Sequence, residues 1–256
     1  MRKTSPRKFT AFFILPLLLS CCHAPSRVEP RQLAEETYED LLISFAAHDY
    51  RQLKDSLARI KTSGVVDKRI FYIEAIVALA ENRPADAVPA LQAALVIDPE
   101  YAEAHNTLGA VYTQQKHYAE AEEALAKAAD NPLYRTPEKA FHQLGFLYQL
   151  QDKHERALAC YQKALAIKAD YFPSHYELSR LYFDLKKFDA AAQEIERARI
   201  LSPTHPGVWL RKAKIAKACG EYADAVAAFG EVLKLQPRGL FADEAAAELD
   251  SLKKYR

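Results

Sequence analysis

Residues 107–112 form the stretch Thr107-Leu108-Gly109-Ala110-Val111-Tyr112, and its glycine belongs to a series of small residues that recurs along the chain. The series advances in steps of 34, 36, 34 and 34 residues, through Ala75, Gly109, Gly145, Ser179 and Ala213. Two further series of small residues keep the same steps: Ala87, Ala121, Ala157, Ala191 and Ala225, and Ala94, Ala128, Ala164, Ala198 and Val232. Three aligned series at one period indicate a chain built from structural repeats.

Bulky residues form two more columns at the same period. One column holds Leu91, Leu125, Tyr161, Ile195 and Phe229, and the other holds Phe71, His105, Phe141, His175 and Trp209. Only Gly, Ala or Ser fits where two antiparallel helices cross closely, and a bulky side chain fills the space where they diverge. Pro99, Pro203 and Pro237 close three of the units, because proline cannot donate the next helical hydrogen bond. The columns therefore predict helical hairpins.

This pattern resembles the tetratricopeptide repeat, in which a bulky first-helix residue precedes Leu-Gly, then an aromatic residue, and then Ala, Phe, Ala and Pro. Five units account for every column: residues 68–101, 102–137, 138–171, 172–205 and 206–239. The resemblance implies an all-α fold, a right-handed superhelical solenoid of tetratricopeptide-repeat helical hairpins that binds other proteins.

Both ends of the array depart from the regular pattern. One period further back, residues 34–67 place Leu41, Tyr50, Leu53, Leu57 and Ile60 in the same columns, but the small residues are absent. This segment forms either a degenerate first repeat or a non-repeat helical hairpin. Residues 240–256 predict a final helix with a polar outer face, and such a helix caps a repeat array because nothing stacks on it.

The first residues indicate an exported, membrane-anchored protein. Four cations precede an apolar stretch over residues 9–19, so residues 1–20 predict a signal peptide. The stretch Leu18-Leu19-Ser20-Cys21 resembles the bacterial lipobox, which implies cleavage before Cys21 and acylation of its thiol. Residues 21–33 would then form a lipidated tether. The alternative is a secretory signal that is cut elsewhere and releases a soluble protein.

The position after the anchor bears on localisation. Cys22 stands there in place of Asp, which in lipoprotein families favours the outer membrane over the inner membrane. We therefore expect a lipid-anchored, periplasm-facing protein of the bacterial outer membrane. The inner membrane and the cell surface are the less favoured locations.

The sequence offers no pattern that points to catalysis. His154-Glu155 begins like a zinc-protease helix, but the second histidine four residues on is absent. Neither a phosphate-binding glycine loop nor a Gly-x-Ser-x-Gly turn occurs. Without the four signal-peptide cations the formal charge falls from +1 to −3, which does not attract nucleic acid. We expect no enzyme activity, cofactor, metal, nucleic acid or small-molecule substrate.

Several polar residues have ordinary structural interpretations. His105 and His175 occupy the bulky column and predict packing residues. The carboxylate pairs Glu120 with Glu123 and Glu194 with Glu196 predict solvated surface. Cys160 and Cys219 lie two repeats apart, so they predict small packing residues that form no disulfide.

The concave face of such a solenoid is lined by positions 2, 5, 9 and 12 of each first helix. Its N-terminal part is apolar and comprises Tyr38, Leu42, Phe45, Tyr72, Ile76 and Leu79. The rest of the predicted partner-binding groove comprises Asn106, His142, Phe146, Tyr176, Arg180 and Phe183, with Lys214 and Lys217 beyond. Because packing within a hairpin does not demand apolar residues at these positions, we expect the N-terminal groove to bind a protein segment. The alternative is that the tether or neighbouring helices cover it.

Residues 130–145 point to a more specific family than the repeat alone does. The two extra residues of the unit 102–137 fall within residues 130–145, where Pro132-Leu133-Tyr134 leads into the helix that contains Gln143-Leu144-Gly145. With the lipobox and about six repeats, this segment looks like the type IV pilus biogenesis lipoprotein (pilotin) family, although Gln143 stands where that family has Asn. The alternative is a simple loop adjustment.

The pilotin resemblance implies an outer-membrane lipoprotein that binds a secretin subunit and helps secretins to reach the membrane and assemble. Another lipoprotein adaptor is the main alternative, one that serves envelope proteases, cell-wall enzymes or barrel assembly through the same groove. An enzyme and a secreted soluble scaffold are further alternatives.

Overall fold

The computed structural model of the protein describes residues 40–41, 43–44, 47, 49–62 and 66–253. The predicted signal peptide, Cys21, the tether and three predicted groove residues, Tyr38, Leu42 and Phe45, lie outside the described residues. Within the described part the secondary structure consists of helices. They are α2 (Tyr50–Thr62), α3 (Lys68–Ala80), α4 (Pro84–Ile97), α5 (Ala102–Gln114), α6 (Tyr118–Asp130), α7 (Pro137–Leu150), α8 (His154–Ile167), α9 (Phe172–Asp184), α10 (Phe188–Leu201), α11 (Pro206–Cys219), α12 (Tyr222–Leu235) and α13 (Leu240–Ser251).

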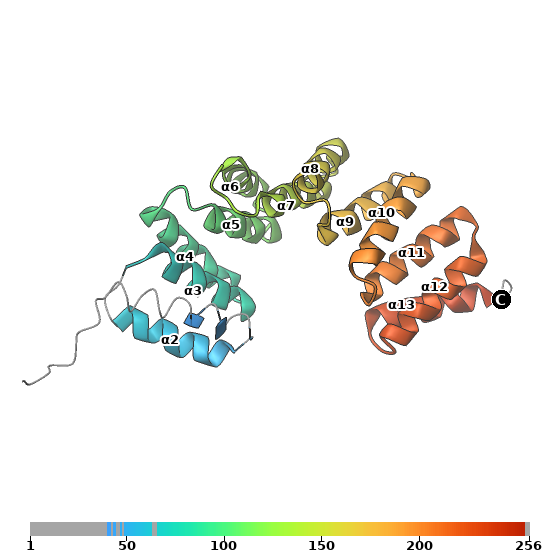
Figure 1. The fold of residues 1–256 in the computed structure, drawn as a ribbon, viewed down its shortest axis with the longest axis horizontal. Coiled ribbons are helices and arrows are strands. Elements are labelled where there is room, and N and C mark those ends of the chain that lie inside the picture. The colour runs from blue at the N-terminus through green and yellow to red at the C-terminus, as the bar shows by residue number, and fades with distance from the viewer. Residues whose placement is uncertain (1–39, 42, 45–46, 48, 63–65, 254–256) are drawn as a thin grey trace, which may run out of the picture.

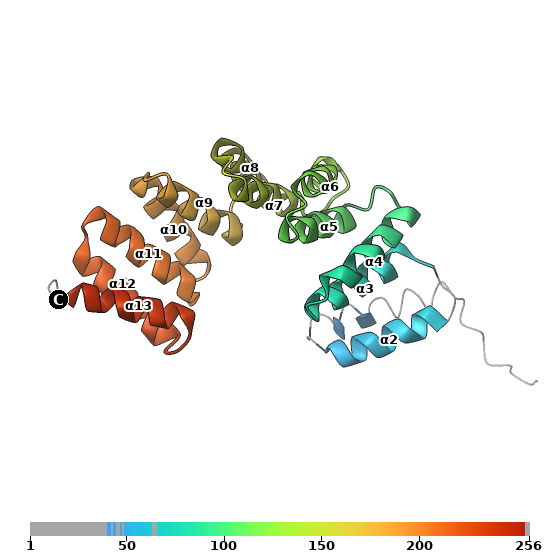
Figure 2. The same ribbon diagram turned by 180° about the vertical axis from the view of Figure 1, so that it is seen from behind.

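The helices pack in consecutive antiparallel pairs that follow one another along an arch (Figure 1). The second helix of each pair also contacts the first helix of the next pair, and α12 contacts α13. Figures 1 and 2 show α5 and α7 toward the inner side of the arch, with α6 and α8 outside them. The predicted all-α solenoid is confirmed.

The small and bulky columns meet inside each hairpin. A Cβ atom at Gly109 would lie 2.5 Å from Leu125 Cγ, and one at Gly145 would lie 2.7 Å from two ring carbons of Tyr161. Leu125 and Tyr161 are fully buried. The helices therefore approach so closely at these two crossings that only glycine fits without a shift.

Every regular hairpin turns through the same backbone conformation. The residue that follows the first helix by one or two positions has a positive φ angle: Asn82, Lys116, Asp152, Lys186 and Gly220, with φ of 57°, 63°, 57°, 57° and 83°. The next amide in each unit donates to a carbonyl five residues earlier, as in the bond of 2.9 Å from Lys153 N to Tyr148 O. This αL ending with its backward hydrogen bond terminates the first helix and starts the return.

The bulky residues of the first helices also form hydrogen bonds to loop carbonyls, which the sequence pattern did not indicate. The ring N–H of Trp209 donates to the Pro203 carbonyl at 2.7 Å, and Nε2 of His105 donates to the Pro99 carbonyl at 2.8 Å. Nε2 of His175 reaches the Ala169 carbonyl at 2.9 Å, and because a carbonyl only accepts, this nitrogen carries the proton. These rings therefore fix the loop that precedes their own helix.

The expectation that Glu194 lies in solvent is wrong. Glu194 is buried, and its carboxylate accepts from Nδ1 of His175 at 2.6 Å and from the Arg197 guanidinium at 2.8 Å. Burial by itself lowers the pKa of His175, but the hydrogen bonds to Glu194 and to the Ala169 carbonyl outweigh burial and raise it. The unit 172–205 thus contains a buried ion pair between its own two helices, α9 and α10.

The ends of the array pack like the middle. Leu41, Leu53 and Ile60 form one buried cluster with Ile70 and Ile73 of α3, so the segment before the regular units shares a core with them. At the other end α13 packs against α11 and α12, with Ala245, Leu249 and Leu252 buried and Leu240 exposed. None of the described helices combines the length and the apolar character that a membrane crossing needs.

The two described cysteines differ from each other. Cys160 is half-buried against the cluster around Leu125 and Leu147, whereas Cys219 is exposed at the end of α11. The expectation that Cys219 is a packing residue is therefore wrong. Both thiols are free.

Candidate functional site

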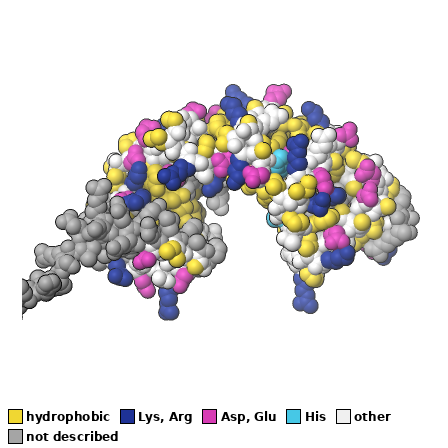
Figure 3. All heavy atoms as spheres, viewed as in Figure 1, with side chains coloured by type: hydrophobic (Ala, Val, Ile, Leu, Met, Phe, Trp, Pro, Cys, Tyr) yellow, Lys and Arg dark blue, Asp and Glu magenta, His cyan; other side chains and the backbone are white. Residues whose placement is uncertain are grey.

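The inner surface of the arch is the candidate site, and the first helix of each hairpin supplies it. The nine predicted groove residues that the structure describes are all half-buried: Tyr72, Ile76, Leu79, Asn106, His142, Phe146, Tyr176, Arg180 and Phe183. In Figure 3 hydrophobic side chains gather on the inner wall toward the N-terminal side. The register thus places these residues along one concave face, each with part of its surface free.

At the N-terminal end the groove residues also serve the core. Tyr72 and Leu79 pack against the cluster built around Ala75, Leu91 and Leu108, and the Tyr72 ring meets the ring of Tyr101 edge-on at 5.5 Å. The expectation that packing does not demand apolar residues here is therefore wrong for Tyr72 and Leu79. Ile76 is half-buried without belonging to that cluster, so it is the clearer groove residue.

The middle of the groove contains a cavity between α5 and α7. Its volume is about 280 Å³, and Ala110, Gln143, Phe146 and Leu150 are among its lining residues. The side chain of Leu150 is 45% exposed, although it is large and apolar. Gln143 and Leu150 occupy positions 6 and 13 of the unit, which the groove prediction left out, and the recurrence of those positions along the repeat could have identified them.

His142 is a packing residue more than a surface group. Its ring lies 5.5 Å from the Tyr161 ring and 5.6 Å from the Tyr171 ring, and its Nδ1 is 3.2 Å from Ser174 Oγ. Burial lowers the pKa of His142 to about 4. At neutral pH this histidine is uncharged and cannot bind an acidic partner through its charge.

Toward the C-terminal side the groove alternates aromatic rings and guanidinium groups. Arg180 lies over the Phe146 ring at 5.9 Å, and Arg211 lies over the Phe183 ring at 5.8 Å. Arg180 also pairs with Glu177 at 2.8 Å. Burial raises the pKa of Glu177, and the charges of Arg180 and Arg211 oppose that shift.

Other predicted groove residues near this end make contacts within the protein. Tyr176 packs against the rings of Phe172 and His205, at centroid distances of 6.0 and 5.8 Å. Lys214 and Lys217 form ion pairs with Glu244 and Glu248 of α13. These two lysines attach the last helix to the array. The guanidinium groups described in this part of the groove are those of Arg180 and Arg211.

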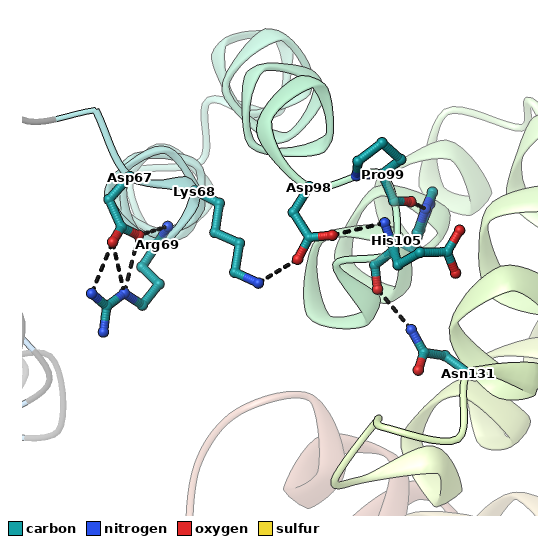
Figure 4. A network of polar contacts seen from close by, with 8 residues as sticks. Asp67, Lys68, Arg69, Asp98, Pro99, His105 and Asn131 are labelled. Carbon is teal, nitrogen blue, oxygen red and sulfur yellow. Dashed lines mark hydrogen bonds and ion pairs between the residues drawn. The ribbon is translucent and has the colours of Figure 1, made fainter.

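The loops between hairpins are held by a separate polar network, drawn in Figure 4. Lys68 pairs with Asp98 and holds the pKa of that carboxyl below its ordinary value, and Asp98 also accepts from the backbone of Glu100 at 3.0 Å. Asn131 donates to the Glu100 carbonyl at 2.7 Å. The network therefore connects the units that begin at 68 and 102 with the two-residue insert.

The insert itself has a defined shape. The side chain of Asn131 accepts from the backbone of Leu133 at 2.8 Å, and Tyr134 is buried while Leu133 is 86% exposed. A loop that only absorbed two extra residues would not need a buried tyrosine.

Within the described residues, no group of three or more His, Cys, Asp or Glu side chains could hold a metal ion.

Comparison with known families identifies the repeat. Three family models, each described as tetratricopeptide repeat, match residues 78–133, 147–206 and 206–238. Together these matches cover more than half of the chain.

Curated relatives share only the repeat region. The chain is 28% identical over 149 residues to a probable UDP-N-acetylglucosamine–peptide N-acetylglucosaminyltransferase SPINDLY of Hordeum vulgare, and 24% identical over 152 residues to the tetratricopeptide repeat-containing protein trd-1 of Caenorhabditis elegans. These matches span 54% and 59% of this chain but only 16% and 19% of the two relatives. The chain therefore corresponds to less than a fifth of either relative.

Solved structures match almost from end to end. The crystal structure of PilW, described as a widely conserved type IV pilus biogenesis factor, has a TM-score of 0.77 at 21% identity, with 84% of this chain and 99% of that chain covered. PilF of Pseudomonas aeruginosa has a TM-score of 0.75 at 20% identity, with 86% and 99% covered. These likenesses show the same fold over nearly the whole of both solved structures.

Proposed function

Because this chain belongs to the tetratricopeptide-repeat family, whose members are generally scaffolds for protein interaction, we propose that it is a membrane-anchored pilotin that assists secretin subunits in type IV pilus assembly. The observation that carries the proposal is the likeness to PilW and PilF over 99% of each of those chains. Those likenesses extend over nearly the whole of each protein and not over a single repeat.

The lipobox supports the anchor in this proposal. Acylation of Cys21 would place the solenoid at a bilayer, since each buried methylene of an acyl chain contributes about 0.8 kcal/mol of membrane affinity. The groove supports the binding role, because apolar side chains such as the half-buried Ile76 and the exposed Leu150 gain from being covered by a partner. No reaction is assigned to the protein.

The binding role is tested by recovering the lipidated protein from its own cell envelope and identifying the retained proteins by mass spectrometry. Three forms are compared: wild type, Ile76→Arg and Val96→Arg. Ile76 lies in the groove, whereas Val96 is 83% exposed at the end of α4, so the two variants add the same charge at different surfaces. Circular dichroism confirms that each variant is folded.

We expect wild type and Val96→Arg to retain a secretin and Ile76→Arg to lose it, because a charge on an apolar groove floor opposes docking. Recovery of wild type without any secretin would refute the pilotin proposal. The adaptor for other envelope complexes would then take its place, and genes for such complexes near this one would support it.

The anchor is tested separately with labelled palmitate. We expect incorporation into wild type and into Cys22→Ala, and no incorporation into Cys21→Ala. Fractionation of the envelope should then place the acylated protein in the outer membrane. Equal labelling of all three forms would show that Cys21 is not the acylated residue.

A further inference from the structure

The last regular unit has a cavity of its own, apart from the groove. Its volume is about 650 Å³, and Ile195 of α10, Trp209, Lys212 and Ala216 of α11, and Asp224 of α12 are among its lining residues. The α11 residues that line it occupy positions 4, 7, 10 and 11 of their unit, whereas positions 2, 5, 9 and 12 form the groove. We refer to it as the α10–α12 cavity, a surface that the groove residues do not share.

The cavity lies where the preceding units have larger side chains. The three units before this one share a leucine at position 7 and a tyrosine at position 11: Leu108 and Tyr112, Leu144 and Tyr148, and Leu178 and Tyr182. The last regular unit has Lys212 and Ala216 at the same positions. Lys212 reaches Glu196 of α10 at 3.0 Å and does not fill the space. The unit therefore lacks the aromatic ring that each of the three units before it contains.

Tyr148 shows what the equivalent place in an earlier unit holds. Its ring packs against the cluster around Leu147, and its hydroxyl donates to Glu122 of α6 at 2.8 Å. Lys153 and Arg156, at the start of α8, lie over the same ring at 5.8 and 5.5 Å from its centroid. The place between two successive second helices thus accommodates an aromatic ring with cations beside it, and the ring and the cations attract each other.

The charges around the α10–α12 cavity are opposite to those around Tyr148. Positions 16 and 19 hold Lys153 and Arg156 in the unit of Tyr148, and Glu221 and Asp224 in the last regular unit. Glu221 and Asp224 are exposed and line the cavity, and neither has an ion-pair partner among the described residues. The cavity therefore combines space for a ring with two unpaired carboxylates at its rim.

The cations near the cavity already have partners. Arg199 and Lys212 both pair with Glu196, at 2.6 and 3.0 Å. Glu231, which also lines the cavity, pairs with Lys234 at 2.6 Å. With the carboxylates at positions 16 and 19 included, these groups comprise four carboxylates against three cations. The site therefore favours a cation from outside over an anion.

We propose that the α10–α12 cavity binds an aromatic side chain of another protein, presented beside a Lys or Arg that pairs with Glu221 or Asp224. The ring takes the place that Tyr148 fills in its own unit, and the cation meets carboxylates where that unit has cations of its own. An acidic segment does not suit the site, because like charges repel. The inference goes beyond the proposed function, since it concerns another surface and requires no secretin.

Two variants fill the cavity with residues that the chain itself uses. Ala216→Tyr restores the tyrosine of position 11, and Ala192→Leu copies the leucine at position 21 of the unit 138–171. Ala192 lines the cavity but is exposed, so Ala192→Leu leaves the core intact even if Ala216→Tyr disturbs it. Circular dichroism shows which of the two variants are folded.

Selection then identifies the ligand. Short random peptides displayed on phage are selected on the purified mature protein, and clones that also bind the folded filled variants are discarded. We expect the remaining peptides to carry an aromatic residue next to Lys or Arg. One of them is synthesised with Tyr or Phe in place of any Trp, so that fluorescence reports on Trp209, the single tryptophan of the chain, which lines the cavity. We expect the Trp209 signal to change on titration, and Ala192→Leu to bind about fivefold more weakly or worse.

Altered peptides separate the ring from the cation. Replacement of the aromatic residue by Ala should weaken binding about tenfold or more, because the buried ring provides most of the apolar contact. Replacement of the neighbouring Lys or Arg by Gln should weaken binding about threefold, since the pair lies at an exposed rim. Glu221→Gln combined with Asp224→Gln should abolish this threefold difference, whereas Glu120→Gln, at position 19 of the unit 102–137, should leave it unchanged.

Several results would overturn the inference: no peptide distinguishes the open cavity from the filled variants, the enriched peptides lack an aromatic residue or a cation, Trp209 fluorescence does not respond, or the cation still matters without Glu221 and Asp224. Residues 254–256 are Lys-Tyr-Arg, so a variant that ends at Lys253 is titrated as well. Tighter peptide binding to that variant would indicate that the protein's own C-terminal residues compete for the cavity, and it would overturn a partner from outside. Secretin recovery is measured independently, so its failure refutes the pilotin proposal alone.

Discussion

Replacement of Gly145 by alanine should destabilise the solenoid, although alanine is the better helix former. A Cβ atom at this position would lie 2.7 Å from the Cδ1 and Cε1 atoms of Tyr161. Tyr161 cannot easily move, because it is fully buried, its hydroxyl donates to Gln149 at 2.9 Å, and its ring packs against His142. Either the ring or helix α7 must shift.

The magnitude follows from two opposing terms. Alanine gains about 1 kcal/mol over glycine in a helix interior. Overpacking a tight core costs about 1–3 kcal/mol, and a fully buried ring held by a hydrogen bond to the Gln149 side chain favours the upper end. Gly230 of α12 supplies the matched control, because a Cβ atom there meets nothing within 4 Å. We therefore expect Gly230→Ala to gain about 1 kcal/mol and to exceed Gly145→Ala by about 1–3 kcal/mol.

Urea denaturation followed by circular dichroism measures both free energies of unfolding, and thermal melting should separate the variants by about 2–4 °C for each kcal/mol. A double variant adds a second test. Gly145→Ala combined with Tyr161→Leu recreates the pair that Ala75 and Leu91 form in an earlier unit, so the alanine should cost less in that background. Equal stability of Gly145→Ala and Gly230→Ala would refute the close-crossing argument.

Three further predictions concern charge and backbone. Hydrogen bonding raises the pKa of His175, so its pairing with Glu194 stabilises the folded state fully below the unfolded pKa of about 6.5, and this stabilisation is lost as pH rises through the folded pKa. Urea titrations should therefore show that Glu194→Gln costs more stability near pH 6 than near pH 9. Burial lowers the pKa of His142 to about 4, so between about pH 6.5 and 4 the unfolded chain binds a proton that the folded chain does not. Wild type should therefore lose stability as pH falls through that interval, and melting experiments should show that His142→Gln loses less. Lys186 has a φ of 57°, so Lys186→Gly should raise the melting temperature by relieving roughly 1 kcal/mol of backbone strain. Gly220 has a φ of 83°, so Gly220→Ala should lower the melting temperature. Changes of the opposite sign in the two variants would contradict the αL turn.

The repeat could be read from the chain because its determinants are local. A glycine at 109 and a leucine at 125 belong to one hairpin, and their spacing sets how closely two helices can cross. The period then applies the same packing rule to each unit. The concave positions followed from the register, which placed Ile76, Phe146 and Arg180 on the first helices, where the structure has them half-buried.

Expectations failed where a side chain's environment depends on a distant segment. Glu194 is buried because His175 of the preceding helix offers it a proton, and nothing in the Glu194–Glu196 pattern indicates that partner. Tyr72 packs against Tyr101 of the following hairpin, so a residue assigned to the groove also belongs to the core. Gln143 and Leu150 were missed because the cavity that they line forms only between two neighbouring units.

The sequence by itself determined the hairpin, its period and the register, since each depends on residues within one hairpin or its neighbour. Only the tertiary structure decided which charges are paired. Lys214 and Lys217 reach carboxylates of α13, and Arg180 reaches Glu177. Hydrogen bonds and ion pairs act over a few ångströms, so their partners are set by how successive helices curve past one another, and a one-dimensional pattern does not contain that curvature.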